Sequence, residues 1–287
     1  MSDKILIIGK GFLGGTIFST CQNAGIHVLG THYNKSTPII DITNIHSIEK
    51  VVNQFRPDLI INCAALTNLD QIESNPERAY AINAQGTKNI AEVSRQNKIK
   101  MIHISTDSVF DGKKGMYSED DIRNPINEYA KSKKMGEDFV KEKLDTYIII
   151  RTNFYGYNSE GKFLFNWILK KIKEKQEITG FSDIIFNPLE IRNLSDMIKE
   201  LAYKDFNGVI HLSSNEIFSK YEFIIKIAKM LNFDMRSIIK GSIKNANFTS
   251  TRPLNTSLSN QLAKKILKTQ PLSLKNWLEN FDITNSR

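Results

Sequence analysis

The sequence is poor in cysteine, and this shortage excludes two kinds of protein. It contains two cysteines, Cys21 and Cys63, which the local patterns place in a helix and in a strand. Neither belongs to a cluster with the spacing of a metal site, so no metal centre is expected. Two isolated thiols also argue against a disulfide framework, and we expect both to be reduced core residues of a cytoplasmic protein.

Long apolar runs are also missing. No run approaches the ~20 residues that a membrane-spanning helix needs, so no membrane partner is expected. The first residues lead directly into a strand, without the basic region, apolar stretch and cleavage site of a signal peptide. Both observations favour a cytoplasmic location.

The positively charged residues are not concentrated in one part of the sequence. The net charge of the 287 residues is +8, but lysine and arginine are spread along the sequence. A lysine-rich run at 170–175 keeps apolar residues at helical spacing and is typical of a solvated helix face. No basic arm with interleaved aromatic residues is present, so no nucleic-acid partner is expected. A mild positive field suits anionic small molecules such as dinucleotides and sugar nucleotides.

Short apolar strands alternate with amphipathic helices along the chain. The pattern predicts an α/β fold with a doubly wound parallel sheet of the Rossmann type. Strands are expected at 5–8, 27–30, 59–62, 101–104, 147–150 and 208–212, and helices at 45–55, 77–97, 129–143, 162–173, 193–202, 221–231, 260–267 and 273–281, with a further helix ending near 24. We expect a dinucleotide-binding domain at 1–150, to which sheet segments return at about 182–213. A smaller, mostly helical C-terminal lobe at 151–181 and 214–287 would bind substrate.

A glycine motif follows the first strand. Gly9, Gly11 and Gly14 have the spacing Gly-x-Gly-x-x-Gly between a strand and a helix. In this setting the glycines permit a tight turn, close approach of the backbone to a pyrophosphate, and close packing of helix on strand. The N-terminus of the helix then presents free N–H groups to the phosphates. The motif predicts a dinucleotide cofactor, and a purely structural glycine turn is the weaker interpretation.

The end of the second strand indicates which dinucleotide is preferred. An NAD site commonly has an acidic residue there, which bonds the ribose hydroxyls. Residues 30–36 contain none, and His32 and Lys35 are instead available to meet a ribose phosphate. NADP(H) is therefore favoured, with NAD(H) as the alternative.

A second group of residues indicates proton transfer. Ser105, Thr106 and Asp107 follow an apolar strand, at the edge where open α/β sheets bind ligands. Tyr129 and Lys133 are spaced to share one helix face. A nearby ammonium would lower the pKa of a phenol from roughly 10. The Thr106 hydroxyl could hold a carbonyl oxygen beside the phenol, which makes a proton-transfer site for a ketone or an alcohol. Taken alone, such a Tyr-Lys pair is more typical of a solvated helix face.

Asn83 lies inside the helix predicted at 77–97, where asparagine has low propensity. That helix is expected to start with Asn75 as cap and Pro76 in the first turn. Two interpretations of Asn83 stay open. It is either an exposed helix residue or a buried amide that supports the catalytic turn.

An ordered set of motifs resembles the extended short-chain dehydrogenase/reductase superfamily and, within it, the dTDP-4-dehydrorhamnose reductase family. The set spans most of the chain and comprises Gly9–Gly14, Asn62–Thr67 with Asp70, Ala81–Asn83, Ser105–Gly112, Tyr129–Lys133 followed by Gly136 and Glu137, Arg151 with Thr152, and Arg252–Asn255. The resemblance implies a Rossmann domain with a smaller substrate lobe. It also implies hydride transfer from NADPH or NADH to a 4-keto-6-deoxy sugar on a nucleoside diphosphate.

The resemblance also implies roles for individual residues. Tyr129 would donate the proton, Lys133 would bond the nicotinamide ribose and depress the pKa of Tyr129, and Thr106 would orient the C4 keto oxygen. Together with the motifs above, it gives a cofactor set of Gly9, Gly11, Phe12, Leu13, Gly14, His32, Lys35, Asp41, Ile42, Ala64, Ala65, Thr67, Asn83, Tyr129 and Lys133. The substrate set is Thr67, Asp107, Ser108, Asn153 and Arg252.

Departures from the family pattern leave the sugar unassigned. Family members usually carry Tyr where this chain has Ser108, and a Trp-containing turn where it has Asn153–Gly156. One alternative is an epimerase of the same superfamily, which a tightly retained NAD would favour. A dehydratase usually needs an acid pair, and Asp107 followed by Ser108 lacks the second acid. Another alternative is a non-catalytic regulatory subunit similar to that of methionine adenosyltransferase. A homodimer is one expected assembly.

Overall fold

Six parallel strands form the central sheet of the computed structural model, which describes residues 4–32, 38–158 and 163–281. The strands stand in the order β10-β5-β4-β3-β1-β2, and each neighbouring pair is parallel. Their bounds are β1 Lys4–Ile8, β2 His27–Thr31, β3 Leu59–Asn62, β4 Lys100–Thr106, β5 Tyr147–Thr152 and β10 Gly208–Leu212. The predicted doubly wound parallel sheet is confirmed.

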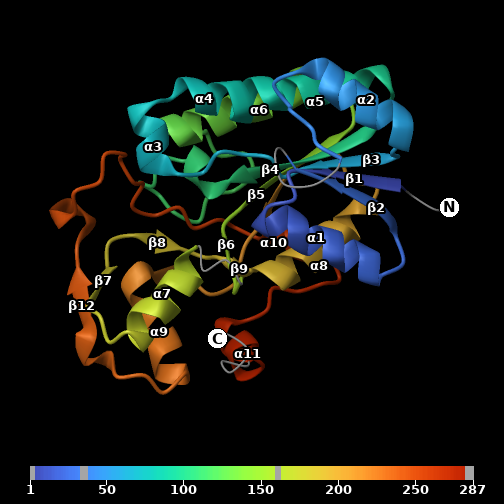
Figure 1. The fold of residues 1–287 in the computed structure, drawn as a ribbon. Coiled ribbons are helices and arrows are strands. Elements are labelled where there is room, and N and C mark those ends of the chain that lie inside the picture. The colour runs from blue at the N-terminus through green and yellow to red at the C-terminus, as the bar shows by residue number, and fades with distance from the viewer. Residues whose placement is uncertain (1–3, 33–37, 159–162, 282–287) are drawn as a thin grey trace.

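Helices cover both faces of this sheet (Figure 1). One face carries α1 (Phe12–Asn23) and α8 (Ile191–Ala202), and the other carries α2 (Ile45–Phe55), α5 (Thr87–Gln96) and α6 (Glu128–Lys143). Successive side chains of a strand point to opposite faces, so both faces of β1 must be apolar. Ile5 and Ile7 accordingly join the core under α1 and α8, while Leu6 and Ile8 join the opposite core.

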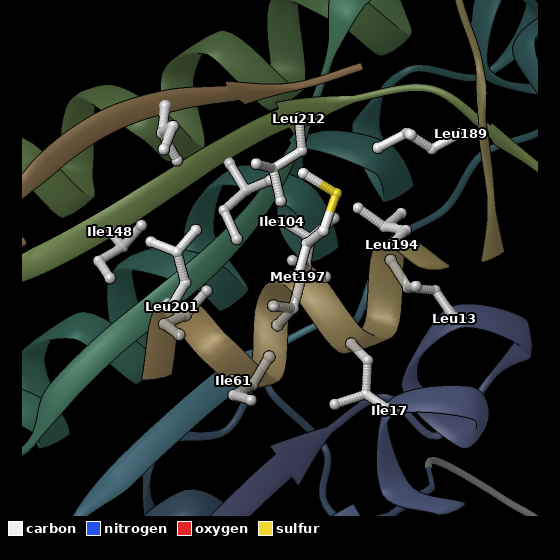
Figure 2. Close-up of a cluster of buried hydrophobic side chains, with 14 of the residues drawn as sticks. Leu13, Ile17, Ile61, Ile104, Ile148, Leu189, Leu194, Met197, Leu201 and Leu212 are labelled. Carbon is white, nitrogen blue, oxygen red and sulfur yellow. The ribbon is translucent and has the colours of Figure 1, made fainter. Parts of the chain in front are cut away.

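The core between the sheet and the α1–α8 pair fixes the helix that follows the glycine turn. Figure 2 shows Leu13 and Ile17 of α1 close to side chains of α8 and of the strands. The strand residues Ile61, Ile104, Ile148 and Leu212 complete the cluster. A fully buried Leu or Ile side chain contributes about 1.5–3 kcal/mol, so α1 is held firmly against the sheet.

A third hydrophobic core lies in the C-terminal half of the chain, among helices and short strands that stand apart from the central sheet in Figure 1. It is rich in aromatic residues, among which Trp277 packs edge-on against Tyr155 and Phe165, with ring centroids 5.1 and 4.7 Å apart. Its helices are α7 (Leu164–Lys173), α9 (Lys220–Met230) and α11 (Leu274–Glu279). Its short strand pairs are β7 (Ile178–Phe181) with β12 (Ile238–Gly241), β8 (Ile185–Phe186) with β11 (Phe218–Ser219), and β6 (Phe154–Tyr155) with β9 (Leu189–Glu190). The remaining helix of this half, α10 (Gln261–Ile266), packs on the sheet core. Within the described ranges, no helix is long and apolar enough to cross a membrane.

The helix predicted at 77–97 is not a regular α-helix. It consists of α4 (Glu77–Ala79), a π-helical segment Tyr80–Gly86, and α5. Asn75 does not cap it but ends the preceding helix α3 (Leu69–Ser74), so that part of the prediction is wrong. The π-helical geometry brings Gly86 against Ile42, where a Cβ would lie 2.6 Å from the Ile42 side chain. Residue propensities do not encode the i→i+5 bonding of such a segment.

A buried ion pair joins α6 to the sheet below the end of β4. The carboxylate of Glu137 accepts bonds from Arg151 Nε at 3.0 Å and Nη2 at 2.9 Å, from Arg123 at 3.0 Å, and from the Ser105 hydroxyl at 2.6 Å. Glu137 and Arg151 are 0% and 1% exposed. Burial disfavours the charged carboxylate, but the bonds and charge of Arg151 hold the pKa of Glu137 below its usual range. The network fixes Ser105, and with it the end of β4.

Glu137→Gln should lower the free energy of unfolding by about 3 kcal/mol at neutral pH, because it leaves the Arg151 charge buried and uncompensated. The pKa of Glu137 is depressed in the folded state, so this loss is complete above pH ~5 and shrinks as the pH falls through the folded pKa. Urea unfolding measured at several pH values tests this. Glu142→Gln, at a 60% exposed position on the same helix, is the control and should change stability by less than ~0.5 kcal/mol. Equal effects of the two substitutions would contradict the role of the pair.

Candidate active site

Steric crowding explains why the turn between β1 and α1 needs its glycines. Gly9 has φ +89°, and a Cβ there would lie 2.5 Å from the backbone nitrogen of Ala64. A Cβ on Gly14 would lie 2.2 Å from the carbonyl oxygen of Gly9. At Gly11, by contrast, a Cβ would meet no atom within 4 Å, so the turn presents bare backbone to open space. This cradle fits the pyrophosphate of a dinucleotide at a helix N-terminus.

A cavity of about 430 Å³, here called the central cavity, adjoins this turn. It brings together residues from the first strand turn, the end of β4 and the start of α6, which are far apart in sequence. Thr106, Tyr129 and Lys133 all line it. The other predicted residues that line it are Gly9, Gly11, Phe12, Leu13, Gly14, Ala65, Thr67, Asp107, Ser108 and Asn153.

Two further cavities extend the central one in opposite directions. The β2-side cavity, also about 430 Å³, shares Gly9, Gly11, Cys63 and Ala65 with it. The predicted residues His32, Asp41, Ile42 and Ala64 line the β2-side cavity, while Lys35 lies outside the described residues. The lobe-side cavity, about 550 Å³, shares Leu69, Asp107, Ser108 and Asn153 with the central cavity and is also lined by Arg252. The three form one row along the carboxyl ends of the strands.

Tyr129 is half-buried and lines the central cavity. Burial raises the pKa of Tyr129 to about 12. A hydrogen bond with Thr106 lowers this pKa, and the charge of Asp107 raises it, but both effects are smaller than that of burial. The prediction that Lys133 would depress this pKa is wrong, because burial is the largest influence. At neutral pH the phenol therefore carries its proton, which suits a donor rather than a base.

The ammonium of Lys133 is held below the cavity floor by buried polar groups. It donates to the Ile104 carbonyl at 2.7 Å and lies 3.4 Å from Nε2 of His103. Burial lowers the pKa of Lys133 to about 8 and that of His103 well below its usual value. Asn62 contacts the other ring nitrogen at 3.1 Å. Neither His103 nor Asn62 was assigned a role from the sequence, although both stand in apolar strands where a polar side chain is unusual.

The carboxylate of Asp107 organises the junction between the central and lobe-side cavities. It is 3% exposed and accepts four hydrogen bonds from side chains. The donors are Thr106 at 3.1 Å, Ser108 at 3.2 Å, Asn153 at 2.9 Å and Thr256 at 2.7 Å. A charge so fully bonded is fixed in place and orients its donors.

Asn83 does not line any of the three cavities. It is 0% exposed, and its amide oxygen accepts from the Leu66 N–H at 2.8 Å while its nitrogen donates to the Leu66 carbonyl at 3.0 Å and to Ser132 at 3.0 Å. The interpretation as an exposed helix residue is therefore wrong, and the cofactor-binding role of Asn83 stays a prediction. Asn83 instead fixes the turn at residues 63–67, which lines both the β2-side and the central cavities.

Several cavity residues were not predicted from the sequence. Lys10 and Arg78 line the β2-side cavity, and Lys220 lines the lobe-side cavity together with the aromatic residues Trp167, Phe181, Phe186 and Phe248. The one available signal was the position of Lys10 inside the glycine motif. Cys63 directly follows β3 rather than lying in it, and burial raises the pKa of its thiol to about 12.

The parallel sheet, the glycine turn at its edge and the Tyr-Lys pair in the adjoining cavity are those of the extended short-chain dehydrogenases/reductases, a class of NAD(P)-dependent oxidoreductases. A family model described as the RmlD substrate binding domain matches residues 3–283. The chain belongs to this family, which confirms the resemblance that its motifs indicate.

Named relatives and solved structures agree with this assignment. A dTDP-4-dehydrorhamnose reductase of Aggregatibacter actinomycetemcomitans is 30% identical over 233 residues, which cover 78% of each chain. The crystal structure of dTDP-4-dehydrorhamnose reductase from Bacillus anthracis, in complex with NADP, has 32% identity and a TM-score of 0.90, and the match covers 99% of this chain and 100% of that one. Methionine adenosyltransferase 2 subunit beta of Rattus norvegicus is 27% identical over 254 residues, 80% of this chain and 73% of the relative.

Asn83→Ala should destabilise the fold by about 2 kcal/mol or more, because it leaves the Leu66 N–H and C=O without their partner. It should also weaken NADPH binding by about tenfold, since the turn at 63–67 would lose its fixed position. Urea unfolding and NADPH fluorescence titration measure the two effects. Asn53→Ala, at an exposed position on α2, is the control and should change neither. An Asn83 variant with unchanged NADPH affinity would contradict this positioning role.

Proposed function

We propose that the protein is an NADP(H)-dependent reductase of a nucleotide-linked 4-keto-6-deoxy sugar. The observation that carries the proposal is the placement of Thr106, Tyr129 and Lys133 in one cavity with the glycine turn. The names of the relatives support it, since one is a dTDP-4-dehydrorhamnose reductase and the similar crystal structure contains NADP. A homodimer and a cytoplasmic location stay predictions from the sequence.

The row of cavities has the layout that a dinucleotide and a nucleotide sugar require. The adenosine half of the cofactor fits the β2-side cavity, its pyrophosphate fits the bare backbone at Gly11, and its nicotinamide end fits the central cavity. The nucleotide sugar fits the lobe-side cavity, with its sugar at the junction near Asp107 and Asn153. Open α/β sheets bind ligands at this edge.

The residues of the central cavity would then share the work of reduction. When bound, the reduced nicotinamide supplies a hydride to the carbonyl carbon. Tyr129, whose pKa of about 12 keeps it protonated, donates its phenolic proton to the carbonyl oxygen, so the ketone becomes an alcohol. Thr106 holds that oxygen beside the phenol, and its own orientation is fixed by a bond from the Ser108 N–H at 3.2 Å. Lys133 bonds the nicotinamide ribose from the cavity floor.

Tyr129→Phe should reduce turnover of a nucleotide-linked 4-keto sugar at least ~10²-fold, the usual loss when a general acid is removed. Its affinity for NADPH should stay within about twofold of the wild type, because the aromatic ring still fills the same wall of the cavity. NADPH consumption at 340 nm measures turnover, and fluorescence titration measures binding. Tyr147→Phe, at a half-buried position on β5 outside the three cavities, is the matched control. Near wild-type reduction by the Tyr129 variant would remove this residue from the mechanism.

Lys10 offers a physical reason for a preference for NADPH. Its side chain lies over the end of β2, where a Cβ on Gly30 would come within 2.9 Å of Lys10 Cδ, and its ammonium stands 3.7 Å above the Phe18 ring. A ribose 2′-phosphate would be placed beside the end of the second strand. Since an exposed ion pair is worth only ~1 kcal/mol, the preference for NADPH over NADH should be modest, on the order of tenfold.

Lys10→Glu should abolish or reverse this preference, because it removes an attraction and adds a repulsion. The catalytic efficiency with NADH should change little, since Lys10 lies on the β2 side of the turn. The test is the ratio of kcat/KM for the two cofactors at low and high salt, and salt should shrink the wild-type advantage of NADPH. Lys50→Glu, on α2 and outside the three cavities, controls for net charge. A wild type that prefers NADH outright would contradict the assignment.

The regulatory role of methionine adenosyltransferase 2 subunit beta is the second candidate function, favoured by 27% identity to that relative. A regulatory subunit has no need of a proton donor beside a keto-sugar cavity. Stoichiometric capture of an enzyme partner, combined with no turnover on any nucleotide-linked keto sugar, would favour the regulatory role. Turnover that depends on Tyr129 would favour the reductase.

A further inference from the structure

Lys220 is an amine on an apolar cavity wall, and it has no hydrogen-bond acceptor among the described residues. It is the first residue of α9, half-buried, and lines the lobe-side cavity. Its ammonium stands 3.3 Å above the ring of Phe186, and within the described part of the chain no oxygen atom accepts a hydrogen bond from it. A half-buried lysine normally snorkels to water or pairs with a carboxylate. Its position in the cavity therefore calls for a ligand.

The charges around Lys220 leave it free to bind an anion. Asp107 is the carboxylate whose field acts on it, but that carboxylate already accepts four hydrogen bonds from other side chains. The other charged groups on neighbouring elements have their own partners: Asp183 with Ser242, Glu222 with Ser219, and Arg252 with Asp70 at 2.9 Å. Among the described residues of this cavity wall, Lys220 is therefore the charged side chain that makes no hydrogen bond or ion pair with the protein.

The lobe-side cavity has two cationic side chains in its described lining, Lys220 and Arg252. A diphosphate diester carries two negative charges and, in an apolar site, must be met by opposite charge. We propose that Lys220 binds the diphosphate of the nucleotide-linked substrate and takes up a proton from solvent as it does so. The inference rests on the proposed function, because it assumes that a nucleotide sugar occupies this cavity.

Proton uptake follows from the surroundings of the amine. Burial lowers the pKa of Lys220 to about 7, although the Asp107 charge opposes this. Above that pH the amine is mostly neutral, and binding of an anion favours the charged form and raises its pKa. Affinity for the diphosphate should therefore fall as the pH rises from about 6 to about 8, by up to about tenfold.

Calorimetry with dTDP-glucose, and with UDP-glucose as a second probe, tests this on the NADPH-loaded protein. Neither probe has a ketone to reduce, and their diphosphate diesters have no proton to lose near neutrality. Titrations at about pH 8 in two buffers of different ionisation enthalpy give the number of protons taken up. The wild type should take up close to one proton per nucleotide at about pH 8 and almost none at about pH 6.

Three variants separate charge from structure. Lys220→Arg keeps a permanent cation, so it should bind the probe at both pH values without proton uptake. Lys220→Met should bind at least about tenfold more weakly at pH ~6, also without uptake. Lys226→Met is the matched control, since Lys226 lies on the same helix over the ring of Phe218 but pairs with Glu216, and it should behave as the wild type.

Two results would overturn the inference while leaving the proposed function intact. One is wild-type binding without proton uptake at pH ~8, and the other is wild-type affinity in Lys220→Met. If neither probe binds to the NADPH-loaded wild type at millimolar concentration, the proposed function fails and the inference fails with it. If Lys220→Met does not fold, as judged by its melting temperature, the inference is tested by Lys220→Arg alone. The pH dependence of probe binding is then compared between Lys220→Arg and the wild type.

Discussion

The close approach of the β1–α1 turn to the backbone after β3 is the constraint on which the site depends. Gly9 nearly touches Ala64, and Gly14 nearly touches Gly9, so three chain segments meet with no side chain between them. This contact sets the height of the α1 N-terminus over the sheet edge and opens the space beside Gly11. The apolar core beneath α1, shown in Figure 2, holds the contact closed. The cofactor side of the site is thus a consequence of backbone packing rather than of polar side chains.

Desolvation is the second constraint, and it acts on three titratable side chains that line the row of cavities. It raises the pKa of Tyr129 and lowers the pKa values of Lys133 and Lys220, so burial drives all three toward their neutral forms. Glu137, beneath the end of β4, behaves differently, because hydrogen bonds and the charge of Arg151 hold its pKa below the usual range. The site therefore contains two amines, Lys133 and Lys220, whose charge responds to what binds beside them.

The fold and the pairing of Tyr129 with Lys133 in one cavity were accessible from the sequence because their signals are local. Apolar runs such as residues 5–8 and 59–62 identify buried parallel strands, and the spacing of Tyr129 and Lys133 places both on one helix face. The glycine spacing indicates the turn for the same reason. The pKa of Tyr129 was predicted in the wrong direction because sequence reveals a neighbouring lysine but not the burial that outweighs it. Lys220 was missed because the pairing of β8 with β11, which brings it to Phe186, joins segments more than thirty residues apart.

Because residues 80–86 form a π-helical segment, the geometry of the site depends on the number of residues in this segment as well as on their identity. An i→i+5 segment holds one more residue than an α-helix with the same ends. Deleting one residue there would restore a regular α-helix between the same ends, so α4 and α5 would keep their places while the side chains of the segment itself would change direction. Asn83 could then no longer face Leu66 while Gly86 still faces Ile42. A single-residue deletion would therefore leave the helix in place and still remove its hold on the turn at residues 63–67.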